Sequence, residues 1–356
     1  MTAASSGLDG VVVADTAISG VDGELGRLVI AGVEVEALAG SIDFAGAAAR
    51  VLSAAGMQAT AEELARELGA ARERAWPIAE RARAAGAFDT ADGMDALRGG
   101  LALVHASGDD RADAVTAIGA APVLVAAWHR ARSGEPAIEP DPRVSHAADY
   151  LRMTLGAPTT DAATRALDAY LVTVIDHGLN ASTFAARVVA STASDLVSAV
   201  VAGVGALKGP LHGGAPGPVL DMLDAIGAPA RAEAWLVDEL AAGRRIMGMG
   251  HRIYRVRDPR AAVLERALAG LSSPRLALAR AVETAAAKIL RERKPDRPLA
   301  ANVEFYTAVL LDAVGLPRDQ FAPTFAIGRV AGWCAHVLEQ RAVGKLIRPA
   351  SRYVGG

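Results

Sequence analysis

The chain has 356 residues, of which 52% are hydrophobic, and its formal net charge at pH 7 is −3. This length exceeds what one core usually supports, so about two domains of roughly 150 residues each are expected. The slightly acidic balance provides no overall basic field, which argues against nucleic acid as a partner. The single cysteine, Cys334, excludes a disulfide within the chain and favours a reducing compartment.

Two further features bear on location. No arginine or lysine precedes Arg27, so the basic start of a signal peptide is missing. The apolar stretch over residues 196–207 is shorter than the roughly 18 residues that a membrane-spanning helix needs. We therefore expect a soluble cytoplasmic protein without membrane contact.

The first part of the chain predicts one short hairpin followed by helices. Residues 10–30 alternate apolar and polar groups around a glycine-containing loop at 19–23, which is typical of a hairpin. Residues 60–83 have a helical composition that Pro77 interrupts. The same helical pattern recurs over three later segments, at 110–132, 142–155 and 161–176.

The second half of the chain continues the helical pattern. Between Phe184 and Val204 the valines fall near helical spacing, which predicts one long buried helix that ends before Lys208. No segment of 20 to 50 residues repeats, so a solenoid is not indicated. Further helices are expected over residues 217–226, 230–242, 258–270, 274–292 and 302–314. The predicted fold class is mostly α-helical.

Three stretches carry groups that can do chemistry. Residues 249–260 read Met-Gly-His-Arg-Ile-Tyr-Arg-Val-Arg-Asp-Pro-Arg, which sets an imidazole and several cations between glycines and a proline. This pattern indicates an anion site with a proton donor. Residues 209–215, Gly-Pro-Leu-His-Gly-Gly-Ala, hold His212, and residues 302–306, Asn-Val-Glu-Phe-Tyr, hold Glu304. Two imidazoles and a carboxylate are therefore available to converge.

In this order the three stretches resemble the citrate synthase family, whose members carry G-P-L-H-G-G-A, G-H-R-x-Y-x-x-x-D-P-R and N-V-D-F-Y motifs. Residues 176–183, 328–329 and 346–355 fit the family as well. The resemblance implies a citrate synthase-like fold with a large helical domain over residues 1–212 and 316–356. It implies a small helical domain over residues 213–315, which carries coenzyme A-binding and catalytic residues beside a cleft.

The resemblance also implies an activity, that of an acyltransferase joining acetyl-CoA to oxaloacetate to give citrate and CoA. Glu304 is expected to remove a proton next to the thioester, where a closed site makes a carboxylate a better base. His212 is expected to donate to the thioester oxygen as it becomes an enolate, and His251 to the ketone oxygen of oxaloacetate. Acyl-CoA is thus a co-substrate, and neither a permanently bound cofactor nor a metal is expected.

The remaining site residues follow from the same resemblance. Carboxylates are best held by planar, bidentate cations, for which arginine is suited. The expected oxaloacetate-binding residues are His177, Arg260, Arg329 and Arg348. The expected coenzyme A-binding residues are Gly248, Gly250, Arg255 and Phe325. A homodimer is expected, with Arg348 reaching the partner's site across a helical two-fold interface.

Glu304 departs from the family pattern, because aspartate is usual at this place. A misplacement of about 1 Å can cost on the order of 100-fold in rate, so a degenerate paralogue that binds oxaloacetate or CoA without turnover is one alternative. A second is 2-methylcitrate synthase, which uses propionyl-CoA. Its extra methylene changes binding in an apolar pocket by only about 1 to 3 kcal/mol. A zinc site and citryl-CoA cleavage are less favoured, because neither a His-Glu-x-x-His spacing nor a nucleotide-binding module is present.

Overall fold

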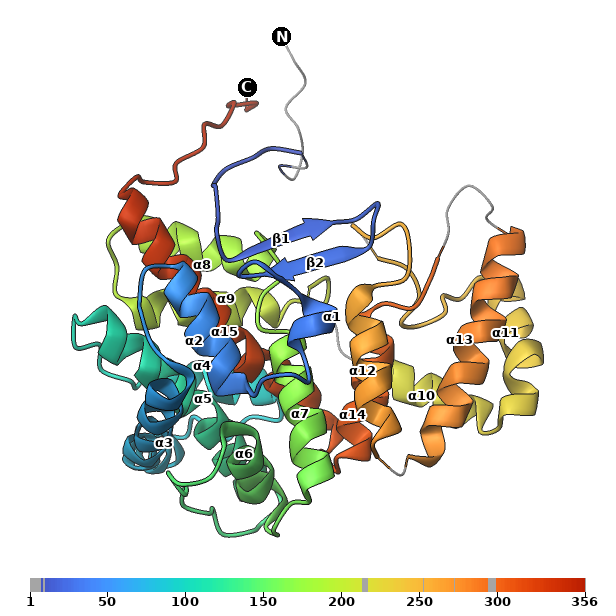
Figure 1. Ribbon diagram of the computed structural model, residues 1–356, viewed down its shortest axis with the longest axis horizontal. Coiled ribbons are helices and arrows are strands. Elements are labelled where there is room, and N and C mark those ends of the chain that lie inside the picture. The colour runs from blue at the N-terminus through green and yellow to red at the C-terminus, as the bar shows by residue number, and fades with distance from the viewer. Residues whose placement is uncertain are drawn as a thin grey trace.

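The computed structural model describes residue 8 and residues 10–212, 217–251, 253–271, 273–293 and 299–355. Within these residues the protein is mostly α-helical, with one small antiparallel sheet (Figure 1). The strands are β1 (Ser19–Asp22), β2 (Arg27–Ile30) and β3 (Val33–Glu34). The helices are α1 (Val35–Leu38), α2 (Phe44–Ala54), α3 (Ala61–Ala84), α4 (Gly93–Leu101), α5 (Asp110–Arg132), α6 (His146–Leu155), α7 (Asp161–Thr173), α8 (Ala181–Ser191), α9 (Leu196–Leu207), α10 (Gly217–Ile226), α11 (Ala232–Ala241), α12 (Pro259–Ala269), α13 (Pro274–Arg293), α14 (Val303–Ala313) and α15 (Phe321–Val343).

The expected hairpin is present, but its loop was misplaced. Ser19 pairs with Ile30 and Asp22 with Arg27, so the residues expected to turn form the first strand. The connection is residues 23–26, where Gly26 adopts a left-handed φ of 64°. Glycine at position 20 suggested a turn, but Ile18 and Ile30 are buried together and hold the neighbouring backbone extended.

Pro77 does not interrupt α3. The helix begins with a capping box: the Thr60 side chain accepts from the backbone N–H of Glu63, and the Glu63 side chain accepts from the backbone N–H of Thr60. The helix then continues unbroken past the proline. A proline inside a helix costs roughly 3 kcal/mol through a lost hydrogen bond and a clash. Here α3 lies along α5 and buries Ala71 and Ala75, so tertiary packing outweighs that cost.

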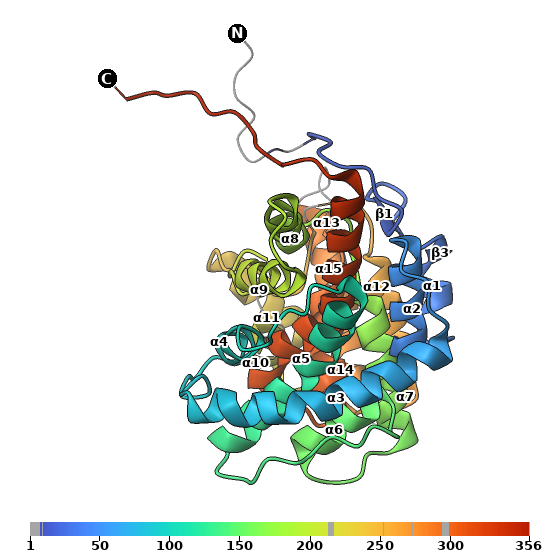
Figure 2. The same ribbon diagram turned by 90° about the vertical axis from the view of Figure 1, so that its left-hand side faces the viewer.

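The single long helix expected between Phe184 and Val204 is two helices, α8 and α9, which pack side by side (Figure 2). Ala193 has a positive φ of 62° between them, and Asp195 caps α9 by accepting from the backbone N–H of Ser198. The valine spacing continued across the break and concealed a polar segment that ends one helix and starts the next.

The other predicted helices are present, with ends that differ by a few residues at most, whereas α1, α2, α4 and α15 were not among the predicted helices. Helix α5 is long and apolar enough to cross a membrane by length and composition, but 83% of its apolar window is buried inside the protein. It therefore lies in the protein core beside α15, which contacts α2, α5, α8 and α9. Cys334 is fully buried on α15, as a structural thiol would be.

Helices α10 to α14 gather on one side of α7, shown at the right of Figure 1. The place where they meet the rest of the fold is called the junction, and β1 and β2 lie above it in this view. Helices α12 and α14 pack on each other and on α7. The division into two domains stays a prediction, and its first boundary adjoins residues 213–216, which lie outside the described residues. Four segments meet at the junction: the loop after α7, the loop before α12, the start of α14 and the middle of α15.

Candidate active site

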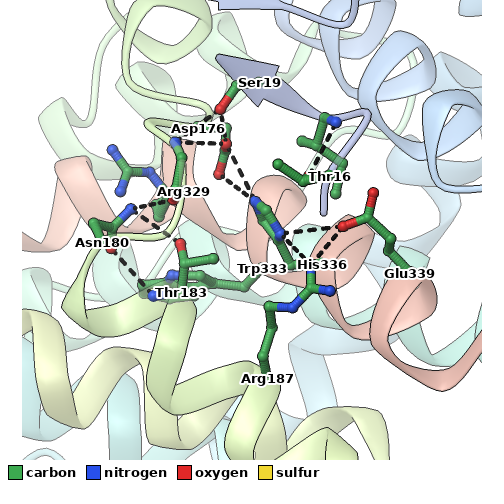
Figure 3. Close-up of polar contacts among 12 residues, drawn as sticks. Thr16, Ser19, Asp176, Asn180, Thr183, Arg187, Arg329, Trp333, His336 and Glu339 are labelled. Atoms are coloured by element: carbon green, nitrogen blue, oxygen red, sulfur yellow. Dashed lines mark hydrogen bonds and ion pairs between the residues drawn. The ribbon is translucent and has the colours of Figure 1, made fainter. Parts of the chain in front are cut away.

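The loop after α7 carries His177 and is anchored by its neighbour, Asp176. The buried Asp176 carboxylate accepts hydrogen bonds from the Ser19 hydroxyl and, at 3.1 Å, from the Gly178 backbone N–H, and it lies 3.2 Å from Nε2 of His336 (Figure 3). Burial raises the pKa of Asp176, but its interactions with His336, including a hydrogen bond, and the charge of Arg329 outweigh it, so the net pKa lies below its usual value. A charged anchor thus fixes the backbone on both sides of His177.

A second layer of buried polar groups supports this anchor. Nδ1 of His336 lies 3.0 Å from the guanidinium of Arg187, which also pairs with Glu339 and donates to Gln340. Glu339 in turn accepts from the backbone N–H of Ala17, so the chain before β1 joins the same cluster. None of these residues was anticipated from the sequence. The only sequence signal for this cluster was the spacing of His336 and Glu339, which lie three residues apart and therefore share one face of a helix.

His212 is held by the start of α8. Its Nε2 accepts from the Ser182 backbone N–H at 3.2 Å and lies 2.8 Å from the Ser182 hydroxyl. Asn180 caps this helix end, and Trp333 donates to the same hydroxyl. Because a backbone N–H can only donate, Nε2 is the acceptor and the proton of the neutral ring is on Nδ1. Burial and the charge of Arg329 lower the pKa of His212 to about 4, so the ring is neutral near pH 7.

His251 has the opposite tautomer. Its Nδ1 accepts from the backbone N–H groups of Ile253 and Tyr254 at 3.0 and 3.2 Å, which leaves the proton on Nε2. Burial and the charge of Arg260 lower its pKa to about 4. A terminal nitrogen of Arg260 lies 3.4 Å from Nε2. Two donors therefore stand side by side, an arrangement that an anionic or carbonyl oxygen would satisfy.

Arg260 is buried in a bidentate pair with Asp258. Its Nε and terminal nitrogen donate to the two carboxylate oxygens at 3.0 and 2.7 Å, and the side chains are only 4% and 1% exposed. Asp258 also caps α12 and accepts from the backbone N–H of Val303 at 3.1 Å. This carboxylate therefore ties the start of α12 to the start of α14, and it orients the cation beside His251.

Glu304 occupies the first turn of α14. Asn302 caps the helix by accepting from the Glu304 backbone N–H at 3.0 Å, and its amide donates to the Gly250 carbonyl at 2.8 Å. Burial raises the pKa of Glu304 to about 7, with the charge of Arg260 opposing the rise. A carboxylate with such a pKa is a far better base at neutral pH than one in water.

Arg329 projects from α15 and is almost completely buried. Its Nε donates to the Val174 carbonyl at 2.7 Å, and its guanidinium lies over the Phe325 ring at 4.9 Å. Burial and the neighbouring charge of Arg260 lower the pKa of Arg329 to about 10. The same two cations, together with burial, hold the pKa of His177 well below its usual value. Two guanidinium groups in one buried region favour an anionic ligand.

Comparisons with known proteins agree with this geometry. The family model "Citrate synthase, C-terminal domain" matches residues 7–350. A citrate synthase from Haloferax volcanii is 38% identical, over 98% of this chain and 95% of its own length. A solved citrate synthase from Thermotoga maritima superposes with a TM-score of 0.84 at 36% identity, covering 99% of this chain and 96% of that one. The chain belongs to the citrate synthase family.

Other relatives in the family carry names that differ from citrate synthase. A 2-methylcitrate synthase from Mycobacterium tuberculosis is 36% identical over 98% of this chain and 90% of its own length. A protein named "Putative citrate synthase 2" from the same organism is 51% identical over 53% of this chain, and the match spans 51% of that relative's length. The predicted family and the citrate synthase-like fold are thus confirmed.

Some residues predicted from the resemblance lie apart from this cluster. Arg255 is exposed and lies 3.8 Å from Glu24. Arg348 is exposed, and its neighbour Ile347 donates from its backbone N–H to Ser191, at the opposite end of α8 from the Ser182 that holds His212. Phe325, by contrast, lies within the cluster, because its ring packs under Arg329.

Gly248 and Gly250 shape the loop that presents His251. Both have left-handed backbones, with φ of 72° and 87°. A Cβ at Gly248 would lie 2.8 Å from Phe305, and one at Gly250 would lie 2.8 Å from Leu299. Glycine is therefore required here for backbone conformation and close packing, whatever contact these residues make with coenzyme A. The glycines that follow His212 in its motif lie outside the described residues.

Proposed function

We propose that this member of the family is a citrate synthase, which converts acetyl-CoA, oxaloacetate and water into citrate and free CoA. The observation that carries the proposal is the pair of neutral imidazoles with opposite tautomers, His212 with its proton on Nδ1 and His251 with its proton on Nε2. One reaction needs two such donors and a base, because a thioester oxygen and a ketone oxygen both gain charge. Glu304 supplies the base.

Oxaloacetate is proposed to bind first, at the buried cations. Its two carboxylates bind Arg260 and Arg329, and His177 holds a further oxygen. Arg260 is already paired with Asp258, so the larger compensation of buried charge is at Arg329. The ketone oxygen then lies between Nε2 of His251 and the neighbouring guanidinium of Arg260. The dianion bridges α12 and α15, which belong to the two sides of the junction, and this favours closure around acyl-CoA.

The condensation follows from these positions. Glu304 takes a proton from the methyl group of acetyl-CoA while the Nδ1–H of His212 stabilises the enolate oxygen. The enolate carbon attacks the ketone carbon of oxaloacetate, a C–C bond forms, and the new alkoxide receives its proton from the His251 side. Water then cleaves the thioester, which releases CoA and citrate. Arg255, Gly248, Gly250 and Phe325 remain proposed coenzyme A contacts.

Release of free CoA, followed with a thiol reagent at saturating oxaloacetate, tests this proposal. Glu304→Gln keeps the size of the side chain and removes the base, so turnover should fall by about 100-fold or more while oxaloacetate binding changes little. Glu80→Gln, at an exposed position on α3, is the matched control and should retain full activity. No release by the wild-type protein despite measurable oxaloacetate binding would instead identify a degenerate, binding-only paralogue.

The thioester preference is the second question for the same assay. Because one relative is named 2-methylcitrate synthase, propionyl-CoA is the alternative substrate to test. One methylene in an apolar pocket changes kcat/KM by roughly 10- to 200-fold. We propose acetyl-CoA, and a higher kcat/KM with propionyl-CoA would reassign the enzyme.

We also propose a homodimer, located in the cytoplasm, in which Arg348 serves the partner's site. The support is that Arg348 is exposed on the segment that follows α15, next to a residue tied to the end of α8 opposite Ser182. His212→Ala and Arg348→Ala proteins, each inactive, can be unfolded and refolded together to form mixed dimers. Recovery of activity is expected, because one site of each mixed dimer then carries neither defect. A mixture that stays inactive would assign Arg348 to its own chain.

A further inference from the structure

Tyr254 lies at the centre of the groups to which the proposed function assigns oxaloacetate. Its side chain is buried, and its hydroxyl lies 3.0 Å from Nε2 of His177. The ring centroids of His177 and His251 are 5.6 and 4.7 Å from that of the tyrosine, and the guanidinium of Arg260 is 5.9 Å from it. The phenol thus contacts three predicted oxaloacetate ligands at once.

The contact with His177 has a chemical consequence. An imidazole nitrogen makes one hydrogen bond along one direction, so Nε2 cannot serve the Tyr254 hydroxyl and a substrate oxygen together. We propose that Tyr254 is a positioning residue that holds Nε2 of His177 in the substrate-free enzyme and releases it to oxaloacetate on binding. This inference rests on the proposed function.

Two properties allow the exchange. Burial raises the pKa of Tyr254 above its usual value, so the phenol is neutral and its bond to the imidazole is an ordinary neutral hydrogen bond. A carboxylate of oxaloacetate makes a charge-assisted bond that is roughly twice as strong. Oxaloacetate therefore outcompetes the phenol.

The backbone around Tyr254 is fixed, so the exchange is a movement of its side chain. The Tyr254 backbone N–H donates to His251, and the next residue, Arg255, donates from its backbone N–H to the Gly23 carbonyl at 2.9 Å. The hairpin connection thus holds the loop against β1 and β2. With both neighbours anchored, rotation of the phenol away from His177 leaves the loop, and the orientation of His251, in place.

The test is the affinity for oxaloacetate of Tyr254→Phe, measured by titration calorimetry without acyl-CoA. Removing a bond that exists only in the empty enzyme should tighten oxaloacetate binding by about 2- to 10-fold and leave kcat within about 2-fold. Tyr306→Phe is the matched control, because its hydroxyl donates to Glu283 away from His177, and it should leave the affinity unchanged. A role confined to packing would not tighten binding.

A double-mutant cycle shows whether the effect passes through the imidazole. In a His177→Asn background, Tyr254→Phe should no longer tighten oxaloacetate binding, because its partner nitrogen is absent. Tyr254→Met, which also lacks the hydroxyl, should shift affinity in the same direction as Tyr254→Phe. Unchanged or weaker binding by both variants, while the wild type binds oxaloacetate, would overturn the Tyr254 role alone. Absence of oxaloacetate binding by the wild type would overturn the proposed function and this inference with it.

Discussion

Glu304 should destabilise the folded protein at alkaline pH, so Glu304→Gln is expected to be the more stable protein there. Burial raises the pKa of this carboxyl from 4.5 to about 7, which means that the folded protein binds the proton more tightly than the unfolded chain. Its contribution therefore favours folding at low pH and is lost as the pH rises from about 4.5 through about 7. The sign is opposite to that of a carboxylate in a salt bridge.

The magnitude follows from the same values. Each pKa unit corresponds to about 1.4 kcal/mol, so the rise from 4.5 to about 7 corresponds to about 3 kcal/mol in the free energy of unfolding. This is an upper value, because the side chain is only partly buried and solvent screens the charge. Roughly 2 kcal/mol of this change in the free energy of unfolding occurs between about pH 5.5 and about pH 8.5.

Urea unfolding at these two pH values provides the assay, with the difference in free energy between Glu304→Gln and wild type as the quantity compared. This difference should grow in favour of the variant by up to about 2 kcal/mol at the higher pH. Glu80→Gln, on the exposed surface of α3, controls for loss of a carboxylate and should show little change. A difference that stays constant with pH, or that favours the wild type at the higher pH, would refute the reasoning.

Two further predictions concern activity. Because Glu304 must be deprotonated to act as a base, kcat/KM should rise about tenfold per pH unit below about pH 7 and then level off. The two donating imidazoles, with pKa values of about 4, should add no second step above about pH 5, so a rate that is flat between pH 5.5 and 8 would contradict the role of the carboxyl. Gly23→Ala places a Cβ close to the Ile253 carbonyl and should lower kcat/KM by about 10-fold or more by displacing the loop of His251. Gly20→Ala, where nothing lies within 4 Å, should be neutral, and equal effects of the two substitutions would count against the displacement.

The sequence by itself determined the residue types of the site and most of the helices. His212, His251 and Glu304 stand in motifs whose order resembles one family, and the helical pattern over residues 110–132 predicted the bounds of α5 from local sequence alone. Such signals act between residues a few positions apart. Where a local signal was ambiguous, as at Pro77, it predicted a break that packing removed.

The tertiary structure alone decided which groups meet and what charge they carry. Ser19 and His336 reach the Asp176 carboxylate from 157 and 160 residues away, and no periodicity connects them. The tautomer of His212 depends on a backbone N–H thirty residues earlier. The pKa of Glu304 is raised by burial, which is a property of the surrounding side chains and not of the residue itself. Local sequence encodes helices and motifs because their interactions are short in sequence, whereas desolvation and pairing arise only when distant elements pack together.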